Sequence, residues 1–131
     1  MAAYVVDSGI LIRHLRGQRS LVRLLRELGR KQDLAISAVT RTEIWAGALE
    51  GQAYTTRRLL GRLQTIPVDR DIADRAGDLI RRTHEQGRTL HMADGLIAAT
   101  AIQQGMTLVT LNVRHFAGLG VRLYPILTIV S

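Results

Sequence analysis

The chain of 131 residues contains no cysteine and a single lysine, Lys31. Without cysteine it can form neither disulfides nor zinc–thiolate sites, and it cannot use a thiolate nucleophile. No apolar run approaches the length of a membrane span, and Asp7 interrupts the short apolar start before it could serve as a signal peptide. We therefore expect a soluble protein of the reducing cytoplasm with no membrane contact.

Several catalytic signatures are missing as well. No glycine-rich phosphate loop of the Walker type occurs, and no Ser-His-Asp order stands out. A phosphotransfer aspartate usually has a second acid two residues later, but Gly9 occupies that position after Asp7. These absences argue against a nucleotide-binding loop, a serine hydrolase and an aspartyl phosphatase.

The composition is that of a compact globular protein. Hydrophobic residues make up 47% of the chain, which is enough for a substantial core. No repeat, low-complexity tract or linker divides the chain, so we expect residues 1–131 to form one domain. The net charge is +7, carried almost entirely by arginine, whose guanidinium fork suits phosphate. The same composition also follows from GC-rich coding sequence or from solvated helix faces.

Short apolar segments alternate with longer amphipathic ones along the chain. The short segments predict strands at residues 4–6, 34–36, 65–68, 108–109 and 121–123. Helices are expected at residues 10–15, 21–28 (ending at Gly29), 40–49, 55–63, 69–86 and 92–104. This alternation is typical of an α/β fold with a mostly parallel sheet covered by helices.

Three acids, Asp7, Glu43 and Asp94, lie where apolar segments meet their neighbours. Each has an ordinary structural explanation. Asp7 suits the turn before Gly9, Glu43 suits a capping box with Thr40, and Asp94 suits the positive end of a helix dipole. The other acids 71, 74, 78 and 85 fall on a polar helix face.

Together the three acids make a different prediction. Parallel α/β proteins present functional groups at the carboxyl ends of their strands, where these acids would converge. Two carboxylates about 4 Å apart repel by roughly 4 kcal/mol at an effective dielectric constant near 20. Such a cluster requires a cation, shared protons or a basic partner. Mg²⁺ or Mn²⁺ meets that requirement, because hard cations prefer oxygen ligands.

Four segments in this order, residues 5–12, 36–47, 93–101 and 108–116, resemble the sequence blocks of PIN domains. The resemblance is closest to the VapC-type toxin ribonucleases of type II toxin–antitoxin systems, and it covers essentially the whole chain. It implies a three-layer α/β/α fold with a short-stranded central sheet.

The resemblance also implies roles for individual residues. The family's catalytic and metal-binding acids correspond to Asp7, Glu43 and Asp94. Glu43 would bind the ion through water or act as a general base, and the sequence leaves both roles open. Supporting polar groups would be Ser8, Thr110 and Asn112. Candidate RNA contacts are Arg13, Arg16, Arg41 and His115. His115 stands where many relatives have a fourth acid, and the resemblance leaves open whether it contacts RNA, lies outside the site or binds the metal.

The implied activity is metal-dependent hydrolysis of RNA phosphodiester bonds with Mg²⁺ (or Mn²⁺), by a homodimeric toxin restrained by a cognate VapB-type antitoxin. Two other functions stay open at this point. The chain could be a non-catalytic RNA-binding or partner-binding PIN module, a reading that His115 favours. It could also be a PIN nuclease of RNA processing that has no antitoxin.

Overall fold

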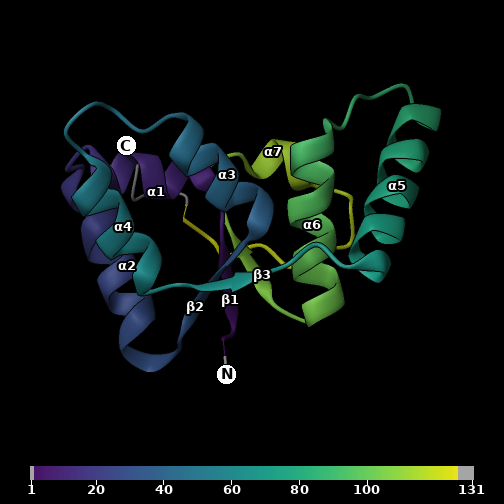
Figure 1. Ribbon diagram of the computed structural model, residues 1–131. Helices are drawn as coiled ribbons and strands as arrows, with labels where there is room; N and C mark the ends of the chain where they lie inside the picture. Colours follow the sequence, from purple (N-terminus) through teal and green to yellow (C-terminus); the bar gives the residue numbers. More distant parts are fainter. Residues whose placement is uncertain (1, 127–131) are drawn as a thin grey trace.

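The computed structural model describes residues 2–126 (Figure 1). Its strands β1 (Tyr4–Val6), β2 (Leu34–Ser37), β3 (Gln64–Ile66) and β4 (Thr107–Val109) form one sheet in the order β3-β2-β1-β4. All three strand pairings are parallel, which confirms the predicted parallel sheet. The strand expected at residues 121–123 contributes only an isolated parallel bridge between Leu108 and Leu123.

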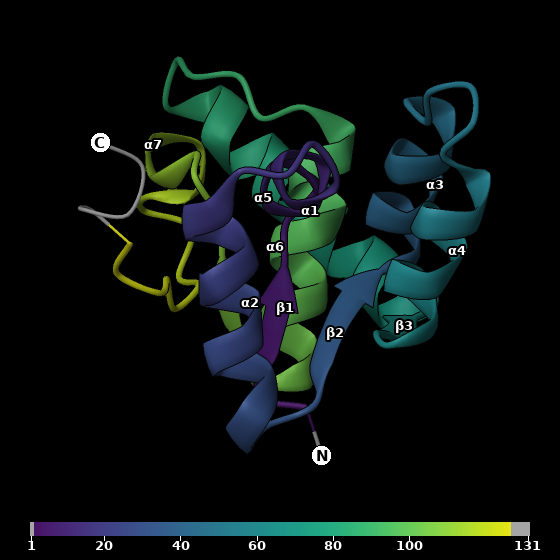
Figure 2. The same cartoon turned by 90° about the vertical axis from the view of Figure 1, so that its left-hand side faces the viewer.

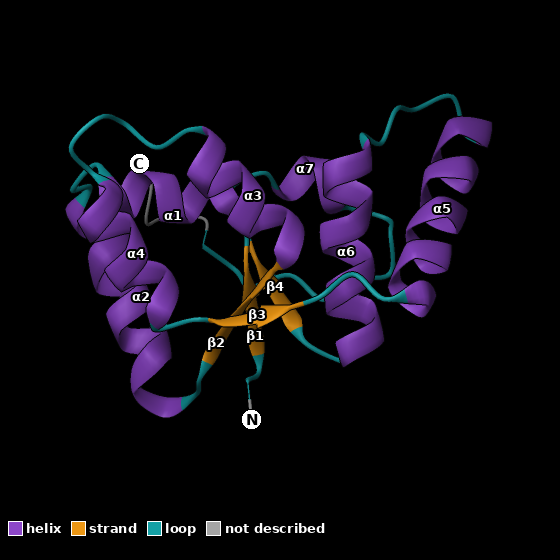
Figure 3. Cartoon of the chain, viewed as in Figure 1, coloured by secondary structure: helices purple, strands orange, loops and turns teal. Residues whose placement is uncertain are grey.

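Helices cover both faces of this sheet, so the predicted three-layer α/β/α architecture is confirmed (Figure 3). On one side lie α1 (Ser8–Leu15), α2 (Arg19–Lys31) and α4 (Ala53–Gly61), the side that faces the viewer in Figure 2. On the other side lie α5 (Arg70–Glu85) and α6 (Met92–Gln104). The remaining helices, α3 (Ala38–Ala46) and α7 (Val113–Phe116), lie near the carboxyl ends of the strands.

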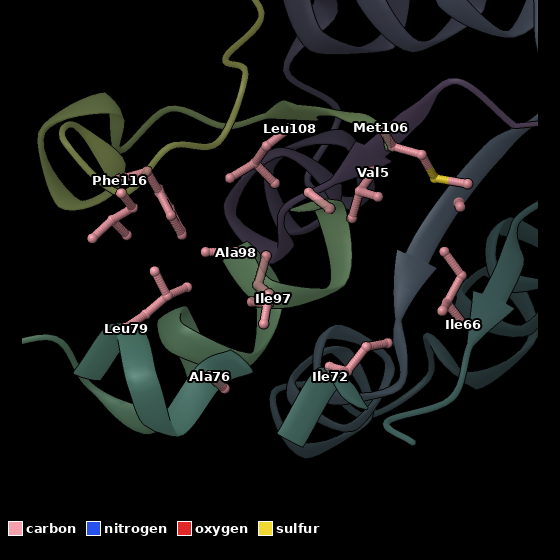
Figure 4. Close-up of a cluster of buried hydrophobic side chains, with 14 of the residues drawn as sticks. Val5, Ile66, Ile72, Ala76, Leu79, Ile97, Ala98, Met106, Leu108 and Phe116 are labelled. Carbon is pink, nitrogen blue, oxygen red and sulfur yellow. The ribbon is translucent and has the colours of Figure 1, made fainter. Parts of the chain in front are cut away.

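Strands β1, β2 and β4 each contribute to two separate cores, because successive side chains point to opposite faces of the sheet. Val5 and Leu108 pack with α5 and α6 in one cluster, which Figure 4 shows. Their neighbours Val6 and Val109 pack in a second cluster with α1, α2 and α4. Burial on both faces explains why β1 and β2 are apolar over several successive residues rather than alternating.

Helix α6 has the predicted bounds and ends at Gly105, whose positive φ of 66° is the left-handed conformation that glycine adopts easily. Other predicted boundaries are wrong: α1 begins at Ser8 rather than at residue 10, and α4 spans Ala53–Gly61 rather than 55–63. Helix α2 continues through Gly29 to Lys31. Helix α3 begins at Ala38 because the hydroxyl of Ser37 accepts a hydrogen bond from the Val39 amide, 3.1 Å away.

The start of α3 therefore excludes the predicted capping box. Thr40 and Glu43 lie within the helix, and Thr40 is fully buried. Helix α3 also ends earlier than expected, at Ala46 rather than near Leu49. Among residues 2–126, none of the helices is both long and apolar enough to cross a membrane.

Helices α5 and α6 pack closely at Gly95, where a Cβ would lie 2.9 Å from two side-chain carbons of Ile80. We expect Gly95→Ala to lower the free energy of unfolding by about 1–3 kcal/mol, because the β-branched Ile80 side chain has few alternative rotamers. Chemical denaturation measures this change.

The matched control is Gly77→Ala in α5, where nothing lies within 4 Å of the added methyl. This exchange should stabilise the protein by roughly 0.5–1 kcal/mol through helix propensity. Equal effects of the two exchanges would contradict the close packing described for α5 and α6.

Candidate active site

The acidic residues gather at the carboxyl ends of the central strands, the edge at which α/β proteins bind their ligands. Asp7 directly follows β1, and Thr110 directly follows the neighbouring strand β4. Asp94 lies in the first turn of α6, and Glu43 lies in α3. Figure 1 shows α1, α3, α6 and α7 arranged around this edge.

Asp7 is the most buried of these acids, with 4% of its surface exposed. Its Oδ1 accepts a hydrogen bond of 2.8 Å from the Ser8 amide and thereby caps α1. Its Oδ2 accepts a 2.7 Å hydrogen bond from the Thr110 hydroxyl. The Thr110 oxygen in turn accepts the Asn112 amide at 3.0 Å. The carboxylate therefore joins the ends of β1 and β4 to the start of α1.

Burial is the largest influence on the Asp7 carboxyl group, and it raises the pKa above the ordinary value. The hydrogen bonds from Thr110 and Ser8 oppose this rise, because they stabilise the charged form. The charge of Asp94 raises the pKa further, and His115 lowers it. Both Asp94 and His115 therefore lie close enough to act on the Asp7 charge.

Glu43 completes the acidic group from α3. Burial raises the pKa of this half-buried carboxyl, the Ser8 hydroxyl lowers it, and the charges of Asp7 and Asp94 raise it again. Its Oε1 is buried and has no hydrogen-bond partner. A buried carboxylate oxygen without a donor destabilises the charged form, and the Ser8 hydroxyl offsets only part of this cost, because the pKa of Glu43 stays raised.

Asp94 faces a histidine across the same edge. Its Oδ2 lies 3.5 Å from Nδ1 of His115 in α7. The Asp94 side chain is 24% exposed and that of His115 is 58% exposed. This contact was not predicted from the sequence, because the short helix that carries His115 was not expected.

These donors fit a hard divalent cation in chemical type. Asp7 uses one acceptor position of each oxygen and retains others, and Glu43 has an oxygen with no partner. Within residues 2–126, however, no three histidine or acidic side chains are arranged so that they enclose an ion as they lie. The oxygen donors of Asp7 and Glu43 thus fit an ion such as Mg²⁺, which binds one or two carboxylates and several waters, in chemical type alone.

The other predicted site residues differ in their positions. Ser8 and Thr110 lie against the acids, whereas Asn112 contributes its backbone amide rather than its side chain. Arg13 and Arg16 are exposed on or just after α1. Arg41 donates a 3.1 Å hydrogen bond to the Thr65 hydroxyl, so its guanidinium is held toward β3.

The raised pKa values of Asp7 and Glu43 predict how stability depends on pH without divalent ions. The folded protein holds these protons more tightly than the unfolded chain, so stability should fall as pH rises from about 4 through the raised pKa values. We expect Glu43→Gln to melt roughly 2–4 °C higher than the parent at pH 7 and to depend less on pH. Thermal unfolding in chelator, followed by circular dichroism from pH 4 to 8, measures both.

Glu50→Gln is the matched control, since Glu50 lies exposed in the loop after α3 and should leave the curve unchanged. If Glu43→Gln melts at or below the temperature of the parent at pH 7, the Glu43 charge is not destabilising.

Comparison with known proteins identifies the family to which the chain belongs. The sequence pattern of the PIN domain matches residues 4–120. Ribonuclease VapC10 of Mycobacterium tuberculosis is 39% identical over 112 residues, which cover 86% of this chain and 84% of that protein. Ribonuclease VapC19 of the same organism is 36% identical and covers 86% and 90% of the two chains.

Solved structures agree with the sequence relatives. A toxin–antitoxin complex from Klebsiella pneumoniae matches with a TM-score of 0.80 at 29% identity, covering 93% of this chain and 96% of that one. The DNA-bound VapBC of Salmonella typhimurium has the same fold, with a TM-score of 0.80 at 23% identity. The chain therefore belongs to the PIN-domain family, and within it to the VapC group.

Proposed function

We propose that this protein is a Mg²⁺- or Mn²⁺-dependent endoribonuclease and the toxin of a VapBC-type toxin–antitoxin system. The observation that carries the proposal is the group of mutually repelling acids at the strand edge. Asp7 and Glu43 have raised pKa values, and Glu43 has a buried oxygen without a donor. Such a group needs a cation, and relatives with this fold are named ribonucleases.

Each residue then has a role that follows from its contacts. Asp7 and Asp94 are the direct ligands, and Thr110 holds the Asp7 carboxylate in place through its 2.7 Å hydrogen bond. Glu43 holds a water or accepts its proton, since its raised pKa suits a general base. The bound ion supplies Lewis-acid stabilisation of charge on the phosphate and makes a water a stronger nucleophile. Ser8 and the Asn112 amide keep the surrounding backbone in register.

The charge distribution supports binding of a polyanion such as RNA. Residues 1–67 contain eleven basic and five acidic residues, a net charge of +6, whereas residues 68–131 carry only +1. Arg81 and Arg82 of α5 pair with Asp78, and Arg81 also pairs with Glu85. Among the described residues Arg13 and Arg16 form no such ion pair, so they remain candidates for RNA contact, and Arg41 is a weaker one.

Partner proteins are the second part of the proposal. The similar structures are toxin–antitoxin complexes, and we propose a VapB-type antitoxin and a cytoplasmic homodimer for this chain. Two hollows flank α4, with volumes of about 240 and 290 Å³. Apolar side chains and arginines line them, and Tyr54 at the rim of one hollow is 68% exposed. This surface suits an antitoxin segment that has apolar and acidic side chains.

A non-catalytic RNA-binding module is the alternative function. Two observations favour it: a histidine faces Asp94, and no three ligand side chains enclose an ion within residues 2–126. That module would show neither stabilisation by Mg²⁺ or Mn²⁺ nor cleavage of RNA.

The proposed activity predicts that the purified protein cleaves total cellular RNA. A divalent ion, Mg²⁺ or Mn²⁺, should be required, and Asp94→Asn should lower the cleavage rate at least roughly 100-fold, because the proposed ion loses a charged ligand. The measurement is the rate of cleavage with and without Mn²⁺, with mapping of the ends produced.

Asp74→Asn is the matched control, because Asp74 lies on the exposed face of α5. This variant should cleave RNA at the rate of the parent. Undiminished cleavage by a folded Asp94→Asn protein would contradict the catalytic assignment.

The proposed antitoxin-binding surface around α4 makes a separate prediction. Tyr54→Ala should weaken binding of the cognate antitoxin about tenfold or more while RNA cleavage stays unchanged, because an exposed aromatic anchor is lost. Isothermal titration of the purified antitoxin measures the affinity. Val68→Ala, another exposed apolar side chain, is the control and should bind normally. Equal affinities for all three proteins would place the antitoxin elsewhere.

A further inference from the structure

One of the two hollows beside α4 lies between that helix and the end of α1, and its lining in the described part of the chain contains no acid. Its volume is about 240 Å³, and we call it the α1–α4 hollow. His14 of α1, Arg58 of α4 and Arg62 at the end of α4 all line it, and both helices lie at the left of Figure 1. The other lining residues are apolar or carry a hydroxyl group: Leu15, Tyr54, Thr55 and Leu59. A hollow that gathers cationic groups without an acid is complementary to an anion.

The imidazole of His14 lacks a partner in this hollow. Its Nδ1 is buried and has no hydrogen-bond partner within residues 2–126. A buried polar atom without a partner costs free energy. Protonation would turn both ring nitrogens into donors, so the charged ring would need an acceptor that its neighbours do not supply. An anion in the hollow would supply the missing negative charge.

The charges around His14 keep the ring neutral in the free protein. Burial lowers the pKa of His14 most, and the charge of Arg62 lowers this pKa further. Among the described residues no other charge shifts it, so α2 and α3, which also pack on α1, bring no acid close enough to stabilise the imidazolium. From α4 the ring faces only Arg58, Arg62 and the phenol of Tyr54 as ionisable groups.

Arg58 is already positioned to receive an anion. Its guanidinium lies over the Tyr54 ring, 6.0 Å from the ring centroid, and this cation–π contact restricts the side chain at the hollow. Neither Arg58 nor Arg62 forms an ion pair with an acid in the part of the chain that the structure describes. Their N–H groups are therefore available for a carboxylate, which a guanidinium binds through two parallel hydrogen bonds.

We propose that the α1–α4 hollow binds a carboxylate side chain of the antitoxin, and that His14 takes up a proton when this carboxylate binds. The inference rests on the proposed function, to which it adds a binding site for one chemical group and a response to pH. A protein side chain fits this hollow better than an RNA phosphate, because Leu15 and Leu59 provide apolar contacts for the methylene groups of an acidic residue.

Binding and protonation strengthen each other in this arrangement. A nearby carboxylate favours the charged imidazolium and so raises the pKa of His14. By linkage, protonated His14 binds the carboxylate more tightly than neutral His14 does. The antitoxin should therefore bind more tightly as the pH falls through the pKa that His14 has in the complex, and the gain should end below the lowered pKa of the free protein.

The first test follows the imidazole protons of the full chain by NMR from about pH 5 to 8. Glutarate, a small dicarboxylate probe, should raise the pKa of His14 by about half a pH unit or more, because it brings negative charge beside the ring. Sodium chloride at equal ionic strength should not have this effect. His84, exposed on α5, is the internal control and should titrate identically with and without glutarate.

The second test is calorimetric titration of the purified antitoxin at several pH values. For the parent, affinity should rise about fivefold or more between about pH 8 and pH 6, and buffers of different ionisation enthalpy should reveal proton uptake. His14→Gln should lose most of this pH dependence while it retains the affinity that the parent has near pH 8. The matched control His84→Gln should behave like the parent.

The possible failures are distinguishable. If the antitoxin binds without a change in the pKa of His14 and without proton uptake, the inference is wrong and the proposed function stands. If single-stranded RNA raises the pKa of His14 and glutarate does not, the hollow contacts phosphate and the inference is also overturned. If the antitoxin does not bind at all, the proposed partner and this inference both fail, whereas metal-dependent RNA cleavage is decided by its own measurement.

Discussion

The buried Asp7 carboxylate is the interaction on which the rest of this edge depends. Its two oxygens accept hydrogen bonds from the first amide of α1 and from the hydroxyl that follows β4. The Asp7 amide also donates to the Val109 carbonyl at 2.9 Å, so backbone and side chain both connect β1 to β4. Through Thr110 and Asn112, the same carboxylate is connected to the start of α7, the helix that carries His115. A residue that looks like a turn former in the sequence is thus a structural junction.

That junction has an electrostatic cost. Asp7 is buried and Glu43 is half-buried near Asp94, and this burial, together with the neighbouring charges, raises both pKa values. A protein without a use for this charge would replace one acid by an amide, which gains stability at neutral pH. Acids with raised pKa values, one of which has a buried oxygen without a donor, are the arrangement expected of a site that binds a cation. Under the proposed function, the net charge of +6 on residues 1–67 would attract a polyanion such as RNA to the protein.

Much of this fold is encoded locally and could be predicted from the sequence. The continuous apolar strands, the bounds of α6 and the glycine at its end follow from periodicity and from glycine's backbone freedom. The capping box at Thr40 failed because Ser37 is an equally good cap three residues earlier, and tertiary burial of Thr40 decided between them. Gly29 did not end α2, because Leu25 and Leu28 are buried in the core and stabilise the last turns of the helix.

The site itself was only partly predictable. The acids were recognisable by their place at segment boundaries, and the hydrogen bond between Asp7 and Thr110 matches the role expected for Thr110. The contact between His115 and Asp94 depends on α7, a helix of four residues with no periodicity to reveal it. Arg41 was near a motif in sequence, but Thr65, 24 residues away, holds its guanidinium. Such long-range contacts follow from packing rather than from local pattern.

The central claim is that a divalent ion binds where these acids meet. Anomalous X-ray scattering from crystals soaked in Mn²⁺ tests it most directly. The account predicts a peak about 2–2.5 Å from carboxylate oxygens of both Asp7 and Asp94. Strong Mn²⁺ peaks elsewhere on the protein, with none at these two carboxylates, would contradict it.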